Sequence, residues 1–171
     1  MIKRWSTFNE SNSVDNFKSE VENIRNYFIE FEDSNSVSYE MKVIGITEND
    51  MCWSINPRTG DFEKWLTTLS EEANRYISSE DYRRLFLRGS EGNFGKHPFC
   101  LCINVKLKGE KDTQYYGSSC DLSDDGVDML EELILSYKRL KSNYGKVIIN
   151  LNSSHSDYKP AMIKVYFNPI S

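Results

Sequence analysis

The chain has 171 residues, 39% of them hydrophobic and 13% aromatic, which is enough apolar material for the core of one domain and argues against a disordered chain. The formal net charge of −5 argues against general binding to phosphate backbones, which requires a basic face. No apolar run is long enough to span a bilayer, and the N-terminal stretch lacks the apolar core of a signal peptide, so we expect no membrane association and a cytoplasmic protein.

The first periodic element is an amphipathic helix. Apolar residues recur at three- and four-residue intervals from Val14 to Phe31, and Ser13 precedes them as a candidate N-cap. The stretches "SVSYEMKVIGI" and "MCWSIN" follow, separated by the turn residues "TEND". They predict two strands that form a hairpin.

Helical spacing returns between Trp65 and Ile77 and continues in a shorter segment from Tyr82 to Phe86, which predicts one broken helix or two short ones. After the loop "RGSEGNFGKHP", apolar and polar residues alternate strictly from Phe99 to Leu107. This alternation is typical of a strand with one buried face. A weaker strand, "TQYYGSS", is predicted to return after the turn "GEKD".

The last helix is predicted from "SDDGVDMLEELILSYKRLKSNYG", with Gly145 as its C-terminal stop. Apolar spacing predicts that Val127, Leu130, Ile134 and Tyr137 face inward. The chain then continues with "KVIINL" and "AMIKVYF", which predict two final strands.

The predicted order of elements is therefore α-β-β-α-β-β-α-β-β. We expect an α+β fold in which an antiparallel sheet carries its helices packed on one face. The stretch Met51–Leu151 has the β-α-β-β-α-β order of a ferredoxin-like split arrangement. Residues 1–12 are expected to be a polar, aromatic leader, and residues 13–171 a single domain.

The stretch "HPFCLC" raises the possibility of a zinc site formed by His97, Cys100 and Cys102. Strict alternation places both cysteines on the polar face of their strand. A structural zinc site takes four ligands, often from C-x-x-C turns, whereas these cysteines are spaced C-x-C within a strand. Cys120 could join them only if a three-residue turn follows Leu107. We therefore predict half-buried thiols and no metal site.

The segment "DLSDDGVDMLEE" resembles the calcium loop of an EF-hand, with ligand-type residues and a glycine at the matching positions: Asp121, Ser123, Asp125, Gly126 and Glu132. It departs from that pattern because Met129 offers no oxygen and a strand precedes the loop in place of a helix. Ser123 as an N-cap with acids in the first helical turn explains the same residues. We favour the helix start, and calcium binding stays open.

No catalytic constellation is recognisable. The stretch "GSEGNFGKH" lacks the first glycine and the Ser/Thr of a P-loop, and no G-x-S-x-G motif occurs. His97 and His155 both lie in predicted loops. No RNA-recognition stretch of the "RGFGFV" type is present, so nucleic-acid binding is not expected. We predict neither catalytic residues nor a cofactor.

The most distinctive polar feature is a basic group around one helix and the glycine-rich loop, formed by Arg83, Arg84, Arg88 and Lys96. On a net acidic chain, such a group can select a partner electrostatically, and we predict that it is the binding site. The leading hypothesis is a non-catalytic protein that binds another protein. The alternative is a binder of a small ligand, nucleotide or nucleic acid, with or without catalysis, that uses the glycine-rich loop and these arginines.

The first eleven residues, "MIKRWSTFNES", resemble the basic, aromatic leaders of small proteins of large tailed bacteriophages. In some head-packaged proteins of such phages, the leader is cut after a Leu/Ile-x-Glu triplet. Phe8-Asn9-Glu10 is similar, with phenylalanine in place of the aliphatic residue. The resemblance implies a phage-encoded accessory protein in the host cytoplasm or the virion, with a host factor or a virion component as its partner.

Overall fold

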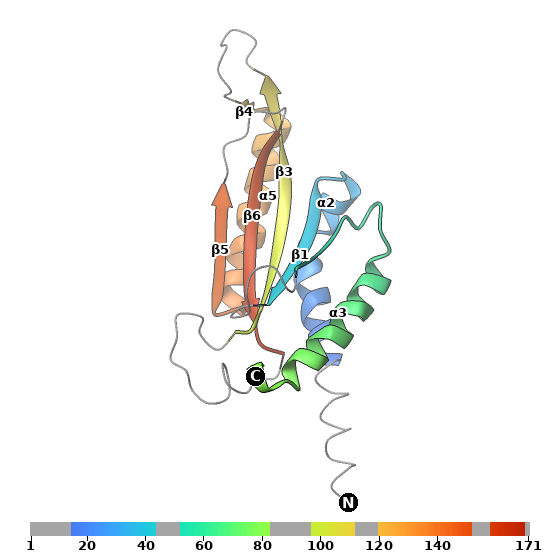
Figure 1. Cartoon of the computed structure of the whole chain (residues 1–171). Coiled ribbons are helices and arrows are strands. Elements are labelled where there is room, and N and C mark those ends of the chain that lie inside the picture. Colours follow the sequence, from blue (N-terminus) through green and yellow to red (C-terminus); the bar gives the residue numbers. More distant parts are fainter. Residues whose placement is uncertain (1–14, 44–51, 83–96, 112–119, 152–157, 170–171) are drawn as a thin grey trace, which may run out of the picture.

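The strands of the protein pair antiparallel throughout, in the order β2-β1-β3-β6-β5, and β4 pairs with one end of β3 (Figure 1). The computed structural model describes residues 15–43, 52–82, 97–111, 120–151 and 158–169. Within these residues, the predicted α+β class and antiparallel sheet are confirmed. The predicted leader, residues 1–12, lies outside them.

The strands are β1 (Val37–Val43), β2 (Cys52–Ile55), β3 (Phe99–Lys111), β4 (Cys120–Leu122), β5 (Lys146–Leu151) and β6 (Tyr158–Phe167). The helices are a first helix over residues 15–25, α2 (Ile29–Asp33), α3 (Phe62–Ile77), α4 (Glu80–Tyr82) and α5 (Asp124–Asn143). In the described part of the chain, no helix is long and apolar enough to cross a membrane.

The helix predicted from Val14 to Phe31 is interrupted. Residues 26–28 form a turn between the first helix and α2. In this turn the Phe28 amide donates to the Arg25 carbonyl at 2.8 Å, which is the tighter i to i−3 pattern common at helix ends. Phe28 and Phe31 are still buried on either side of the turn. The break therefore redirects the chain without removing these side chains from the core.

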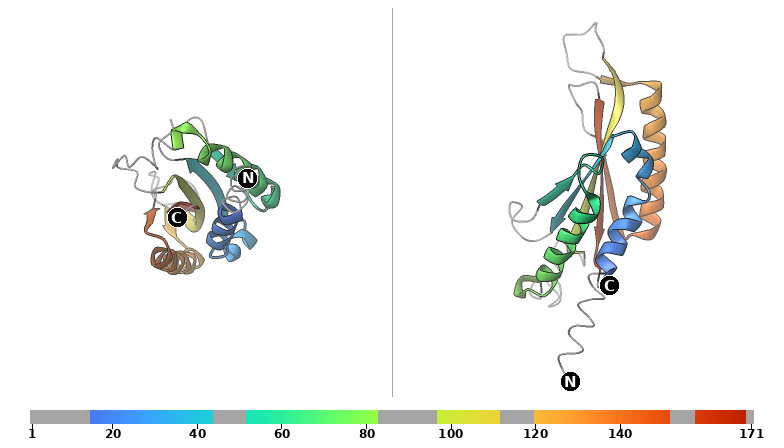
Figure 2. Two further views of the ribbon diagram at one scale, coloured as in Figure 1. Left: turned by 90° about the horizontal axis from the view of Figure 1, so that it is seen from below. Right: turned by 90° about the vertical axis from the view of Figure 1, so that its right-hand side faces the viewer.

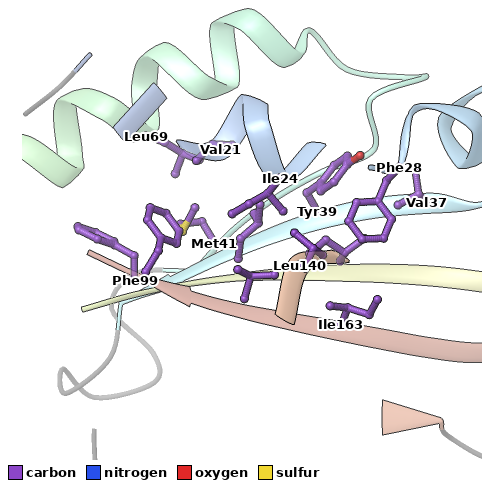
Figure 3. Packing of buried hydrophobic residues seen from close by; sticks show 14 of the residues in the cluster. Val21, Ile24, Phe28, Val37, Tyr39, Met41, Leu69, Phe99, Leu140 and Ile163 are labelled. Atoms are coloured by element: carbon purple, nitrogen blue, oxygen red, sulfur yellow. The ribbon is translucent and has the colours of Figure 1, made fainter. Parts of the chain in front are cut away.

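One face of the sheet carries the core. Alternate residues of β1, β3 and β6 are buried together with side chains of the first helix, α3 and α5. Figure 2 shows these helices arranged around the curved sheet, and Figure 3 shows side chains from both layers meeting, among them Ile24, Met41, Phe99, Leu140 and Ile163. Period-two strands thus supply one apolar face, as the alternation predicted.

The predicted ferredoxin-like segment, Met51–Leu151, does not form its own sheet. β1 lies between β2 and β3, and β6 lies between β3 and β5. Two strands from outside the segment therefore separate the strands that the split arrangement would bring together. β3 is the central strand, with β1 and β6 as its full-length neighbours.

The inward face of α5 differs from the prediction. Val127 and Ile134, which were expected inside, have 43% and 37% of their surface exposed. Leu130 and Tyr137 are only partly buried. The fully buried positions of this helix are Gly126, Leu133, Ser136 and Leu140. The buried side is therefore shifted around the helix, and two predicted core residues lie on the surface.

Candidate functional site

The predicted basic site cannot be placed on the fold. Arg83, Arg84, Arg88 and Lys96 all lie outside the described residues, which stop at Tyr82 and resume at residue 97. Their joint role in binding stays a prediction from the sequence.

Cys100 and Cys102 lie on the same face of β3, opposite the helices, as the alternation predicted. Their sulfur atoms are 3.8 Å apart. They are not half-buried, however, because their exposed fractions are only 2% and 0%. Neither forms a disulfide. The pair is therefore shielded from solvent on a face of the sheet that has no helix of the core.

The strand register surrounds this thiol pair with charged and aromatic residues. Lys42 of β1 pairs with Cys100, and Lys164 of β6 pairs with Cys102. The hydrogen bond between the two thiols raises the pKa of Cys100, and burial raises it further. The same hydrogen bond lowers the pKa of Cys102, helped by the positive charges of Lys42 and Lys164.

The backbone of Cys120 lies far from this pair. β3 extends to Lys111, and the backbone of Cys120 pairs with Lys111. Lys111 lies nine positions beyond Cys102 along the strand, which corresponds to about 30 Å. The zinc interpretation required a three-residue turn after Leu107 to bring in Cys120. β3 continues to Lys111 instead, so this turn does not form. Within residues 15–43, 52–82, 97–111, 120–151 and 158–169, no group of three or more His, Cys, Asp or Glu side chains could hold a metal ion.

Burial of the thiol pair leads to a prediction about reactivity. In native protein at neutral pH, we expect iodoacetamide to modify Cys100 and Cys102 far more slowly than in urea-unfolded protein, because the reagent needs an accessible thiolate. Peptide mass spectrometry after timed quenching measures each cysteine separately. Equal rates in the folded and unfolded states would show that this face of the sheet opens readily.

The residues of the calcium interpretation form the start of α5. Ser123 is its N-cap, and its hydroxyl accepts a hydrogen bond from the Gly126 amide at 3.2 Å. Asp125 forms an ion pair with Lys108 at 3.1 Å. Glu132 lies exposed in the helix, two turns after Asp125. The helix-start interpretation is confirmed. Among the residues that the structure describes, no three His, Cys, Asp or Glu side chains are grouped so that they could hold a metal ion.

A polar groove of about 650 Å³ separates the first helix and α2 from α5. Its lining groups bond to each other: the Tyr144 hydroxyl donates to Glu20 at 2.6 Å, and the Asn143 amide donates to the Tyr27 hydroxyl at 2.9 Å. The hydroxyl of Ser136 donates to the Tyr27 carbonyl at 3.1 Å. These hydrogen bonds tie the helices together across the groove.

His97 lies just before β3 and lines a second hollow of about 380 Å³, together with Asn16, Tyr144 and Pro169. Burial lowers the pKa of His97, and the positive charge of Lys146 lowers it further. The imidazole is therefore neutral at physiological pH. It does not belong to any metal-binding group among the described residues.

The outer side of α5 combines exposed apolar residues with charge. Val127 and Ile134 lie about 160° around the helix axis from the groove residue Ser136, because each residue turns the helix by 100°. This side is turned away from the groove that the first helix and α2 line. In Figure 1, β5 and the first helix lie to either side of α5. β5 itself exposes Leu151 on the helix side. Its other exposed apolar residue, Ile148, pairs with Lys164 and so lies on the helix-free face of the sheet with Cys102. We call Val127, Glu131, Ile134 and Lys138, together with the edge of β5, the α5–β5 surface.

This surface was not recognised from the sequence because its apolar members fitted a core pattern. Scattered exposed apolar residues are common on proteins, but several next to an open sheet edge are typical of contact sites. Comparison of the chain with protein-family models, curated proteins and solved structures finds no match.

Proposed function

We propose that this protein is a non-catalytic module that binds another protein through the α5–β5 surface. The observation that carries this proposal is the exposure of Ile134 near the middle of the most highly charged helix. An apolar residue surrounded by charges is the usual composition of an interface centre and its rim. The partner class expected from the leader, a host factor or a virion component, is part of the proposal.

The remaining hollows favour a protein partner over a small ligand. Small-molecule sites are concave and mostly apolar, with a few unpaired polar groups pointing inward. The groove of about 650 Å³ is instead polar, and Tyr27, Ser136 and Asn143 use their polar atoms to bond across it. A protein partner needs no cavity, because it can cover a convex helix and a strand edge.

The proposal predicts that Ile134→Lys abolishes partner capture. Immobilised full chain would be incubated with bacterial lysate, and retained proteins compared with those held by wild type. We expect at least about a tenfold loss, because truncating a hot-spot residue at the centre of an interface costs about 2 kcal/mol or more. The circular dichroism spectrum should stay unchanged, since Ile134 is already exposed.

The matched control is Ile29→Lys, which makes the same chemical change at a residue of α2 with 46% of its surface exposed. Ile29 lines the polar groove and lies outside the α5–β5 surface. Its variant should retain the partner. Loss of capture in both variants, or in neither, would contradict the assignment of this surface. In the latter case the predicted cluster of Arg83, Arg84 and Arg88 would be the next surface to replace.

A further inference from the structure

The edge of β5 is suited to pairing with another strand. Among the described strands, β5 pairs only with β6, so its other side presents backbone groups without a ladder. Its sequence, "KVIINL", contains no proline and only one charge, at Lys146. Edge strands are normally protected by charges, proline or a covering segment. Within the described part of the chain, the β5 edge has none of these protections beyond Lys146, and a strand can be added there.

The charges of α5 are arranged so that the helix complements itself. Asp124, Asp125, Asp128, Glu131 and Glu132 lie in its first half, and Lys138, Arg139 and Lys141 in its second half. The middle of the helix falls between Leu133 and Ile134. An antiparallel copy would place each acidic half beside a basic half. The macrodipole also favours this order of charges, but it does not account for an exposed isoleucine at the midpoint.

The positions of individual residues agree with a two-fold axis at Ile134. Glu131 precedes Ile134 by three residues, and Lys138 follows it by four, so an antiparallel copy brings Glu131 close to Lys138 of the partner subunit. Within one chain these two residues are seven positions apart, about 10 Å along the axis, and cannot pair. Val127 would lie against the aliphatic stem of Lys141 of the partner subunit, which can cover apolar surface.

We propose that the occupant of the α5–β5 surface is a second copy of this chain. The two α5 helices pack antiparallel through Ile134, and the two β5 edges pair antiparallel, which continues the sheet across the two-fold axis. Such a contact is isologous, because the same surface serves both subunits. This inference rests on the proposed function and makes the partner at this surface a second copy of this chain, in place of a host factor or another virion component.

Charge exchange tests this arrangement. Analytical ultracentrifugation of the full chain should give a species of twice the 19.9 kDa chain mass. Glu131→Lys should weaken dimerisation by about tenfold or more, because it places like charges opposite each other across the interface. Lys138→Glu should do the same. The double variant Glu131→Lys/Lys138→Glu should recover the dimer, since the pairs re-form with reversed polarity.

Recovery in the double variant is the decisive result, because the two residues do not touch within one chain. Dimers that persist in both single variants, or single variants that the double variant does not rescue, would overturn the two-fold arrangement. Wild type that stays monomeric at all concentrations would also overturn it. If the wild type is monomeric but captures a different protein, and Ile134→Lys abolishes this capture, the proposed function stands without the dimer. If capture does not depend on Ile134, both the proposed function and the dimer are contradicted.

Discussion

Replacing Gly126 with alanine is expected to lower the free energy of unfolding by about 3 kcal/mol, the upper end of the usual cost of overpacking. A Cβ atom at this position would lie 1.9 Å from the carbonyl oxygen of Lys108. The oxygen belongs to the backbone of β3, which cannot move freely because β6 pairs with it at Lys108 and β4 pairs with it at Gly109. Either α5 or the central strand must therefore shift.

The same carbonyl fixes the start of α5. It accepts the backbone amide of Ser123 at 3.3 Å and the Ser123 hydroxyl at 3.4 Å. A displacement that relieves the clash also stretches these bonds. In an open position, alanine would stabilise a helix by up to about 1 kcal/mol relative to glycine. A loss of stability in Gly126→Ala would therefore indicate the clash with the Lys108 carbonyl. A gain in stability would indicate an open position.

Gly145→Ala is the matched control. Its added Cβ would meet nothing nearer than Nε2 of His97, at 3.8 Å, which is ordinary contact. Urea denaturation followed by far-UV circular dichroism should show a large loss for Gly126→Ala and little change for Gly145→Ala. If Gly126→Ala proved as stable as wild type, α5 would have to lie farther from the Lys108 carbonyl of β3 than the structure places it.

Local patterns predicted the elements well because each depends on nearby residues. Alternation in β3 placed Cys100 and Cys102 on one face, and Ser123 was identified as the N-cap of α5. The neighbours of each strand could not be read in this way. That β6 pairs with β3 depends on contacts between residues 50 or more positions apart along the chain. Pairings between distant segments leave no periodic signal in the sequence. The ferredoxin-like order was compatible with the sequence, but the strands are arranged in a different order.

The orientation of α5 was missed for a different reason. Gly126 and Ser136 point inward, one because no side chain fits against β3 and the other because its hydroxyl bonds to the Tyr27 carbonyl. A prediction from apolar spacing places both residues on the outward side of the helix. It assigns Val127 and Ile134 to the core instead, and so conceals the α5–β5 surface. The symmetric charge pattern of the helix was the available signal.

The ionic contact that joins the N-terminal helices to the sheet was also invisible in the sequence. Glu32 accepts two hydrogen bonds from the guanidinium of Arg25, at 2.7 and 2.8 Å, and a third from the Tyr39 hydroxyl at 2.7 Å. The Arg25 guanidinium also lies 3.8 Å from the ring centre of Phe62. The cluster therefore connects the first helix, α2, β1 and α3. Burial raises the pKa of Tyr39, and the bond to Glu32 raises it further, so its hydroxyl remains a donor.

Glu32→Ala should therefore lower the free energy of unfolding by about 2 to 3 kcal/mol. Hydrogen bonds to charged groups are worth about 1.5 to 3 kcal/mol, and removing the acceptor takes the carboxylate partner from both Arg25 and buried Tyr39. Removing one partner of a fully buried ion pair destabilises a protein by about 3 to 5 kcal/mol. The loss here should be smaller, because 27% of the Arg25 side chain is exposed. Tyr39→Phe should cost less, because it leaves the bidentate pair intact. The loss of unfolding free energy caused by Tyr39→Phe should be smaller still in a chain that already carries Glu32→Ala.

Glu72→Ala provides the comparison, because Glu72 also pairs with an arginine, Arg75, one turn away on the exposed face of α3. Exposed pairs of this kind contribute about 0 to 1 kcal/mol. Urea denaturation of both variants under the same conditions should therefore give clearly different losses. Similar losses for Glu32→Ala and Glu72→Ala would mean that the Arg25–Glu32–Tyr39 cluster is solvated like a surface pair, and that apolar packing alone holds the N-terminal helices on the sheet.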